Sequence, residues 1–290
     1  MKNRILLAGM PSSGKTTYIA GLWYFVSQNM DNKSLILDSL TGSNDQYLNN
    51  IRQKWVEYKK VPRTSRGSES GEPVRMNLIR STDQKKLVLN IPDFSGEIFN
   101  EQFEFREWSQ EFNNEINTTD GVILFIDPND SNNKPHLLFH SNEITSAMGE
   151  HDFNVTEMSI NEWKHEYTPI QTKLVDFLQF LDYKRKLPAG FKIAIIVSSW
   201  DEIIKAYDAI TPLNWIENNL PLFHQYIVCN KHLFSIEYFG VSAQGGDYEN
   251  PNSLEDLLSK DPLERIIVQQ GEEISNDIAK PILWITTDDN

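Results

Sequence analysis

The sequence predicts an α/β fold in three layers, in which helices cover both faces of a mostly parallel sheet with one antiparallel edge strand. An apolar run, Ile5–Ala8, leads directly into a glycine-containing loop and then into a helical pattern. Two later runs, Gly121–Ile126 and Ile193–Val197, are almost continuously apolar, which is typical of strands buried on both faces of a parallel sheet. Upstream of them, Val74–Arg80 and Leu87–Ile91 alternate apolar and polar residues, which predicts an antiparallel hairpin.

The length, charge and cysteine content of the chain exclude several classes of protein. It has 290 residues, enough for one large domain that we expect to span residues 1–290, and it carries 41 acidic against 27 basic side chains for a net charge of −14. Such a chain is poorly suited to nucleic-acid backbones or anionic membranes. The single cysteine, Cys229, excludes an intrachain disulfide and a cysteine-ligated zinc site. The first apolar run is too short for a signal peptide or a membrane span, so we expect a cytoplasmic protein.

The loop after the first apolar run, Gly9–Thr17, fits G-x-x-x-x-G-K-[ST], the P-loop, and specifies the fold class as a P-loop NTPase. Gly9 and Gly14 permit backbone conformations closed to other residues, so that successive N–H groups cradle anionic phosphates. Lys15 is expected to reach the β- and γ-phosphates, and the Thr16 hydroxyl to ligate Mg²⁺. The residues expected to bind the phosphates are Gly9, Pro11, Ser12, Ser13, Gly14, Lys15, Thr16 and Thr17.

A second motif follows the predicted hairpin. Its second strand runs into Asp93–Gly96, a D-x-x-G sequence that acts as the γ-phosphate sensor of GTPases. Asp93 is expected to hold Mg²⁺, usually through water, and the Gly96 N–H to contact the γ-phosphate and to move when that phosphate leaves. The motif is short, and a turn residue at the end of a strand is the alternative interpretation of Asp93.

Two further strand ends carry candidate base-binding residues. Ser198–Asp201 lies where GTPases have [NT]-K-x-D, and a carboxylate there can accept from both the N1–H and the N2–H₂ of guanine. Ser198 and Ser199 replace the usual Asn or Thr and the Lys that packs along the base, and helix capping is the alternative role of Asp201. The strand candidate Phe234–Val241 ends at Ser242–Gln244, similar to S-A-K. The residues expected to bind the base are Ser199, Trp200, Asp201, Ser242, Ala243 and Gln244.

Together these motifs make residues 1–246 resemble a Ras-like GTPase of the TRAFAC class. More narrowly, the chain resembles bacterial double-GTPases, or TRAFAC-like GTPases, of anti-phage conflict systems. That narrower resemblance rests on Gly14–Thr17 with Gly21–Trp23, Pro62–Thr64, Ser199–Asp201 and Pro281–Trp284. It implies GTP and GDP as ligands, Mg²⁺ as cofactor, hydrolysis of GTP as a switch, and a regulatory role in prokaryotic defence. Protein partners or self-association through the switch regions are also implied.

The resemblance also assigns roles near the γ-phosphate. The polar region 38–73 would be a long switch I, in which Thr64, or otherwise Thr41, completes the magnesium coordination. Ras-like enzymes often have a water-orienting Gln after D-x-x-G, whereas this chain has Glu97, which cannot donate to the phosphoryl group and repels it. We therefore expect slow intrinsic hydrolysis that a partner or self-association accelerates. The residues expected in catalysis are Lys15, Thr64, Gly96 and Glu97, and the expected metal ligands are Thr16, Thr64 and Asp93.

Two other functions stay open at this point. A GTP-binding assembly protein with negligible hydrolysis would also tolerate Glu97. A P-loop kinase is disfavoured because kinases need several late lid arginines, and Arg265 is the one arginine after residue 186. Arg63, Arg66 and Arg106 are candidates for an arginine finger, with a solvated surface charge as the alternative for each.

The remaining segments predict helices and one insertion. Residues 129–159 form a polar insertion whose three histidines lack the spacing of a zinc site. A long helix is expected over 161–187 and shorter ones from Thr211 and Pro221. The aromatic residues between Phe99 and Phe112 have helical spacing, which predicts either core packing or a partner-binding face. We expect 247–290 to be a helical extension, with a last amphipathic helix over 263–278 that Lys280-Pro281 ends.

Overall fold

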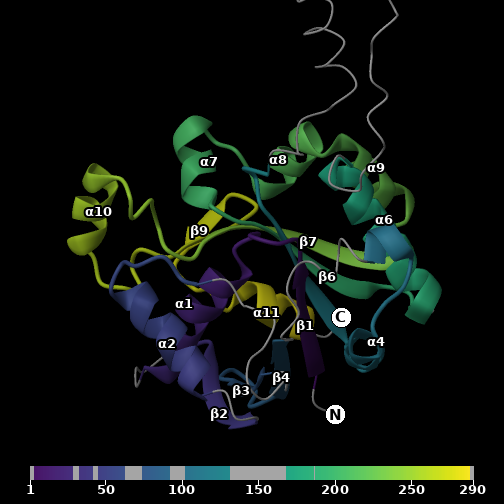
Figure 1. Ribbon diagram of the computed structural model, residues 1–290, viewed down its shortest axis with the longest axis horizontal. Coiled ribbons are helices and arrows are strands. Elements are labelled where there is room, and N and C mark those ends of the chain that lie inside the picture. Colours follow the sequence, from purple (N-terminus) through teal and green to yellow (C-terminus); the bar gives the residue numbers. More distant parts are fainter. Residues whose placement is uncertain are drawn as a thin grey trace, which may run out of the picture.

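The computed structural model describes residues 3–28, 33–41, 45–62, 74–91, 102–130, 168–185 and 187–287, and these build one nine-stranded sheet (Figure 1). Its spatial order is β2-β3-β4-β1-β5-β6-β7-β8-β9. The strands are β1 (Asn3–Gly9), β2 (Leu35–Thr41), β3 (Val74–Arg80), β4 (Lys86–Ile91), β5 (Gly121–Ile126), β6 (Phe191–Val197), β7 (Phe234–Ser242), β8 (Ile267–Gln270) and β9 (Glu273–Ser275). The helices are α1 (Lys15–Ser27), α2 (Asp45–Val56), α4 (Gln110–Asn117), α6 (Ile170–Arg185), α7 (Trp200–Ala206), α8 (Pro212–Asn219), α9 (Pro221–Cys229), α10 (Pro251–Leu258) and α11 (Lys280–Thr286).

The centre of the sheet is parallel, as predicted. Strands β4, β1, β5, β6 and β7 pair side by side in the same direction. The predicted hairpin is also confirmed, because β3 pairs antiparallel with β4 from Val74 opposite Ile91 to Ile79 opposite Lys86. The antiparallel part of the sheet is larger than the single edge strand that we expected: β2 joins β3 on one side, and the β8–β9 hairpin joins β7 on the other.

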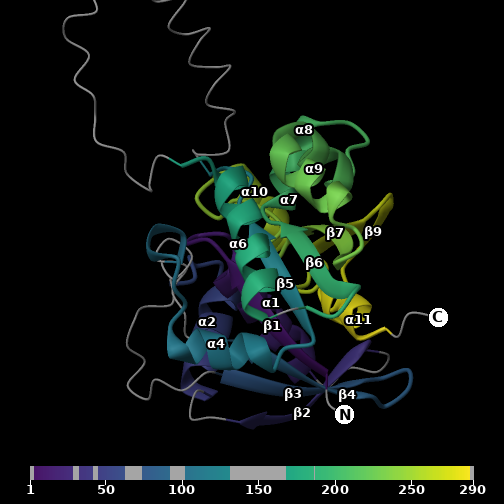
Figure 2. The same ribbon diagram turned by 90° about the vertical axis from the view of Figure 1, so that its right-hand side faces the viewer.

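Helices cover both faces of the sheet, because alternate residues of each central strand point to opposite sides. In β1, Ile5 and Leu7 belong to the apolar cluster beneath α1, α2 and α11, while Leu6 and Ala8 belong to the cluster beneath α4, α6, α8 and α9. In Figure 1, α1 and α2 lie on one side of the strands and α4 and α6 on the other, and Figure 2 is seen from the side of α4 and α6. The predicted three-layer α/β architecture is therefore confirmed.

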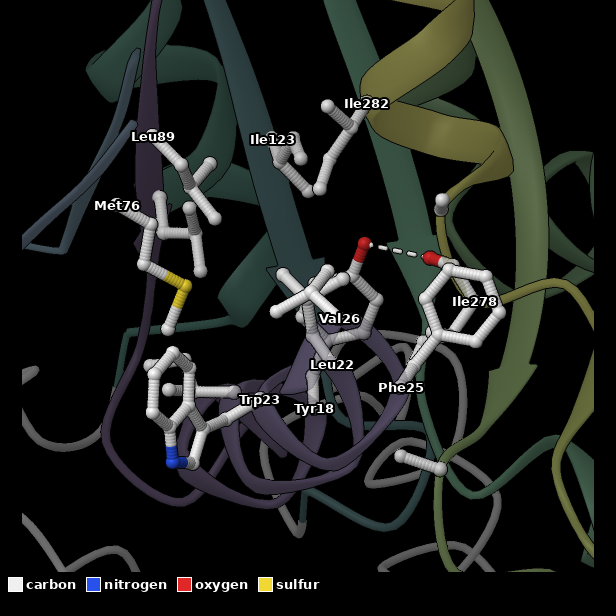
Figure 3. Close-up of a cluster of buried hydrophobic side chains, with 14 of the residues drawn as sticks. Tyr18, Leu22, Trp23, Phe25, Val26, Met76, Leu89, Ile123, Ile278 and Ile282 are labelled. Carbon is white, nitrogen blue, oxygen red and sulfur yellow. Dashed lines mark hydrogen bonds between the residues drawn. The ribbon is translucent and has the colours of Figure 1, made fainter. Parts of the chain in front are cut away.

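Helix α1 packs its apolar side onto the sheet and is tied to the C-terminal part of the chain. Leu22 and Val26 are buried against strand residues such as Ile123, and the Tyr18 hydroxyl donates a hydrogen bond of 2.8 Å to the Ile278 carbonyl (Figure 3). Burial raises the pKa of Tyr18, with the charge of Asp277 acting in the same direction. This bond fixes the helix that follows the P-loop to a segment 260 residues further along the chain.

The predicted helix over 263–278 is wrong, and 247–290 is not purely helical. Residues 267–275 form the β8–β9 hairpin, whose turn contains Gly271 at φ 56°. The β-branched residues Ile267 and Val268 pair with the edge of β7, and this long-range pairing overrides the local apolar spacing. Lys280-Pro281 begins α11 rather than ending a helix, because proline fits the first turn, where its missing N–H is not needed.

The other helices largely follow the predictions. α2 lies within the polar region 38–73, and α8 and α9 begin at the predicted prolines. α6 covers the described part of the expected helix over 161–187, and nearly all of the predicted insertion lies outside the described residues. No helix among the described ranges is both long enough and apolar enough to cross a membrane.

The aromatic residues just before α4 and in its first turn are divided between the core and the surface. Trp108 and Phe112 are buried and pack edge-on at 4.9 Å between ring centroids, and Trp108 also meets Phe180 of α6 at 4.8 Å. Phe105 is exposed. The core interpretation therefore holds for the end of this stretch, while Phe99 lies outside the described residues.

We expect Gly240→Ala to destabilise the fold by about 1–3 kcal/mol, which is typical of overpacking a core. A Cβ atom at Gly240 would lie 2.1 Å from the indole ring of Trp200, which has no exposed surface. Urea unfolding of both proteins measures this change. Ser235→Ala, a change on the same strand that adds no atoms, serves as the control. Equal midpoints for Gly240→Ala and the wild type would contradict the packing described here.

Candidate functional site

A cavity of about 610 Å³ opens at the carboxyl ends of β1, β5, β6 and β7. Because these strands are parallel, the segments that follow them meet at one edge of the sheet, where α/β proteins bind ligands. The walls come from the loop 11–18, from residues at and after the ends of β5 and β6, from most of the segment 241–249, and from Tyr58, Lys60 and Val61 after α2. The sequence motifs after β1, β6 and β7 thus line one cavity.

The P-loop has the curved backbone that phosphate binding requires. Ser12 (φ 63°) and Gly14 (φ 86°) are left-handed, and Gly14 caps the N-terminus of α1. A Cβ at Gly9 would lie 2.7 Å from the Phe125 carbonyl oxygen, and one at Gly14 would lie 2.9 Å from the Cβ of Ser198. The two motif glycines are therefore required by close packing as well as by conformation.

Lys15 lies inside this loop. Its ammonium donates hydrogen bonds to the carbonyl oxygens of Gly9 and Met10, both at 2.7 Å, and to Ser13 Oγ at 3.2 Å. Burial lowers the pKa of Lys15 to about 7, because the charged form loses its hydration. The Ser13 hydroxyl donates to the Met10 carbonyl, so this buried side chain braces the loop.

At the other end of the cavity, the predicted base-reading motifs are joined by a direct hydrogen bond. Ser242 Oγ donates to Asp201 Oδ1 at 2.6 Å and accepts from the Gly245 backbone N–H at 3.0 Å. Asp201 is only 4% exposed, and the Lys205 ammonium lies 3.5 Å from its other oxygen. Asp201 lies inside α7 and binds Ser242 rather than capping the helix, so the helix-capping alternative is not supported.

The residues around Asp201 differ in their roles. Ser199 is left-handed (φ 47°) and lines the cavity. Trp200 was predicted to bind the nucleotide, but it does not line the cavity. Its indole is fully buried and donates a hydrogen bond of 2.8 Å to Gln269 Oε1. The large apolar ring is directed into the core because α7 begins here and packs against β7. Gln244 also lines the cavity, and its amide donates to the Gly246 carbonyl at 2.7 Å.

Several predicted residues lie outside the described part of the chain: Thr64, Asp93, Gly96, Glu97, Arg63 and Arg66. Thr41 ends the edge strand β2. Arg106 is described, and it pairs with Asp176 of α6, to which the Gln102 amide also donates at 3.1 Å. Arg106 is not among the residues that line the cavity, so its role as an arginine finger within the same chain is not supported.

Few side chains in the described ranges are candidates for binding a metal ion. Thr16, a predicted ligand of Mg²⁺, lines the cavity beside Lys15. Within the described ranges, no group of three or more His, Cys, Asp or Glu side chains could hold a metal ion.

Four residues that line the cavity were not predicted from the sequence. Tyr58 and Lys60 follow α2, Asp127 follows β5, and Tyr248 follows the Ser242–Gln244 loop. Desolvation raises the pKa of Asp127, with further contributions from the charges of Asp130 and Glu202. An acidic residue directly after an apolar strand is the signal that could have pointed to Asp127. No comparable signal marks the tyrosines.

In the comparison with known proteins, the family model of Double-GTPase 1 matches residues 6–285. Similar solved structures include Sup35 complexed with GDP, with 10% identity and a TM-score of 0.36, covering 85% of this chain and 38% of that one. Another is nucleolar GTP-binding protein 1 from Plasmodium falciparum, with 13% identity and a TM-score of 0.36, covering 89% and 87% of the two chains. This chain thus spans little more than a third of the Sup35 chain. Curated proteins gave no match.

We expect GDP binding at pH 8 to take up a proton through Lys15. Burial holds the pKa of Lys15 near 7, so at pH 8 the amine is mostly neutral, and a bound phosphate favours its charged form. Affinity should therefore fall as the pH rises above 7. Calorimetry in two buffers of different ionisation enthalpy measures the uptake. Lys59→Met, an exposed change outside the cavity, should preserve it. A binding enthalpy that is independent of the buffer would contradict this expectation.

Proposed function

Because the chain belongs to the Double-GTPase 1 family, we propose that it binds GTP and hydrolyses it to GDP as a magnesium-dependent molecular switch. The observation that carries this proposal is the pairing of two features in one cavity. A P-loop with a buried lysine lies at one end, and a buried carboxylate oriented by Ser242 lies at the other. A nucleotide is a ligand that offers phosphates to the first feature and a base to the second.

The phosphate end supplies positive charge in a chain that is negative overall. The N–H groups of the P-loop and the N-terminus of α1 face the phosphates, and Lys15 can exchange its bonds to the loop carbonyls for phosphate oxygens. A hydroxyl such as that of Thr16 is a hard oxygen ligand of the kind that Mg²⁺ prefers. When bound, Mg²⁺ would neutralise charge that develops on the β- and γ-phosphate oxygens.

The base end supports guanine. One carboxylate can accept from the neighbouring N1–H and N2–H₂ groups of guanine, whereas adenine offers no such pair of donors. The bond from Ser242 fixes one oxygen of Asp201, and the carboxylate retains lone pairs for the base. Adenine would leave the carboxylate buried and unmatched, which is how a polar site rejects the wrong ligand.

The hydrolytic step depends on groups that we propose from the sequence. Lys15 would stabilise the charge that develops on the transferring phosphoryl group. Glu97 would stand where Ras-like enzymes have the water-orienting glutamine. It would orient the attacking water poorly, because its negative charge repels the phosphates. A partner protein, or a second copy that docks on the switch regions, would then supply the missing stabilisation. The resemblance to defence-system GTPases further suggests a regulatory role in prokaryotic immunity.

The nucleotide preference tests the assignment of Asp201. We expect the wild type to bind GTP at least tenfold more tightly than ATP, in line with about 1–3 kcal/mol for a matched bidentate pair. Asp201→Asn should lose affinity for GTP and gain affinity for xanthosine triphosphate, because an amide can donate to the additional carbonyl of xanthine. Competition against a fluorescent nucleotide measures both effects. Glu202→Gln, which removes the neighbouring carboxylate of the cavity wall, should keep the preference for GTP. Equal affinities of the wild type for GTP and ATP would refute guanine recognition.

Hydrolysis should be slow for the isolated chain. We expect single-turnover phosphate release from dilute protein at about 10⁻² s⁻¹ or slower, the range of switch GTPases without an activator. Glu97→Gln should raise this rate, and Lys15→Met should abolish it. Raising the protein concentration tests for activation by self-association. A fast rate in the dilute wild type would remove the need for a partner, and no detectable release under any condition would favour an assembly protein.

A further inference from the structure

Beside the base end of the cavity lies a buried guanidinium surrounded by aromatic rings. The Arg265 side chain, in a residue only 2% exposed, lies 4.2 Å from the ring centroid of Trp55, 4.3 Å from that of Tyr58 and 6.0 Å from that of Tyr248. Cation–π contacts of this kind gain strength when they are desolvated. Arg265 therefore holds together rings from α2, from the turn after it, and from the segment after β7.

The hydrogen bonds of Arg265 fix its position without neutralising its charge. Nη2 donates to the Trp55 carbonyl at 2.9 Å, and Nε donates to the Pro262 carbonyl at 3.3 Å. Nη1 is buried and has no hydrogen-bond partner among the described residues. No carboxylate in the described ranges pairs with this guanidinium, and a buried charge without such a partner is costly. The aromatic rings are therefore its main favourable surroundings among the described residues.

Two of these rings reach the cavity. Tyr58 and Tyr248 both line it, and their rings meet edge to face with centroids 5.7 Å apart. Tyr58 is held in a left-handed conformation (φ 56°), and its hydroxyl donates to the Leu257 carbonyl at 3.2 Å. Non-glycine residues in this conformation persist only where the surroundings fix them, and they cluster at ligand sites.

Tyr248 lines the same cavity as Asp201 and is within electrostatic reach of its carboxylate. Desolvation raises the pKa of Tyr248 to about 12; Arg265 opposes this rise, and Tyr58 and Asp201 add to it. Its hydroxyl is buried without a hydrogen-bond partner in the described structure. The ring therefore belongs to the end of the cavity that contains Asp201 and Ser242.

We propose that Tyr58 and Tyr248 form the aromatic face on which the nucleotide base rests, and that Arg265 is the positioning residue for both rings. The inference rests on the proposed function in that the ligand is a nucleotide. Its chemical basis is the serine at position 199, which is too short to cover the face of a base as the lysine of the motif does. Base–aromatic stacking provides the missing contact, and it tolerates any purine because every base has a π-face.

The test separates base binding from phosphate binding. Direct calorimetry measures the affinities of each protein for GDP and for inorganic pyrophosphate, which has no base. Tyr58→Leu and Tyr248→Leu should each weaken GDP binding about 5- to 150-fold, the range for loss of one stacked ring, and leave pyrophosphate binding unchanged. Tyr248→Phe keeps the ring and should bind GDP as the wild type does. Tyr183→Leu, an exposed tyrosine on α6, is the matched control.

Arg265 is tested by a substitution that keeps its charge. A lysine has no planar group to stack on the rings, so Arg265→Lys should weaken GDP binding without weakening pyrophosphate binding. Thermal unfolding in the absence of ligand identifies any variant that fails to fold. If a variant fails to fold, the GDP affinities of Tyr58→Phe and Tyr248→Phe, which retain both rings, are compared with that of the wild type instead.

The possible outcomes are distinct. A loss specific to GDP in the leucine and lysine variants supports the aromatic face. Equal losses for GDP and pyrophosphate, or no loss in folded variants, would overturn it. If Asp201→Asn still exchanges guanine for xanthine while the tyrosine variants bind GDP normally, the proposed function stands and this inference fails. If the wild type does not prefer GTP to ATP, the guanine assignment fails, while the comparison of GDP with pyrophosphate still decides whether the rings contact a base.

Discussion

The close approach of the P-loop to its neighbouring strands is the constraint on which the site depends. Gly9 lies against the end of β5, and Gly14 lies against Ser198 at the end of β6, each so closely that a single added carbon would collide. Ser198 directly precedes the segment that carries Asp201. The distance between the phosphate end and the base end of the cavity is therefore set by two positions without side chains and by the spacing of parallel strands.

A second set of contacts fixes the orientation of the groups that this arrangement brings together. Ser242 holds the carboxylate of Asp201, Gln244 binds within its own loop, and Trp200 anchors the start of α7 in the core. These are buried or part-buried polar contacts with matched partners, which rigidify a site. Lys15 differs from them, because its partners are loop carbonyls that a phosphate oxygen can replace.

The sequence predicted those parts of the structure that local pattern determines. The P-loop, the apolar central strands and the β3–β4 hairpin follow from glycine spacing and from hydrophobic periodicity. It did not predict the β8–β9 hairpin, because pairing with the distant β7 decides between strand and helix there. Arg265 appeared in the sequence only as an isolated arginine. Its contact with Trp55, 210 residues earlier, has no local signature.

Trp55 gives α2 an influence on the base end of the cavity. Its indole donates a hydrogen bond of 2.9 Å to the carbonyl of Ala243, in the loop after β7, and its own carbonyl receives Arg265. Helix α2 is thus linked through Trp55 both to the loop after β7 and to Arg265, which packs against the aromatic rings. The bonds of Lys15 to the P-loop carbonyls involve no residue of this helix. The α2 contacts of Trp55 thus reach only the side of the cavity that holds Asp201 and Ser242, away from the P-loop.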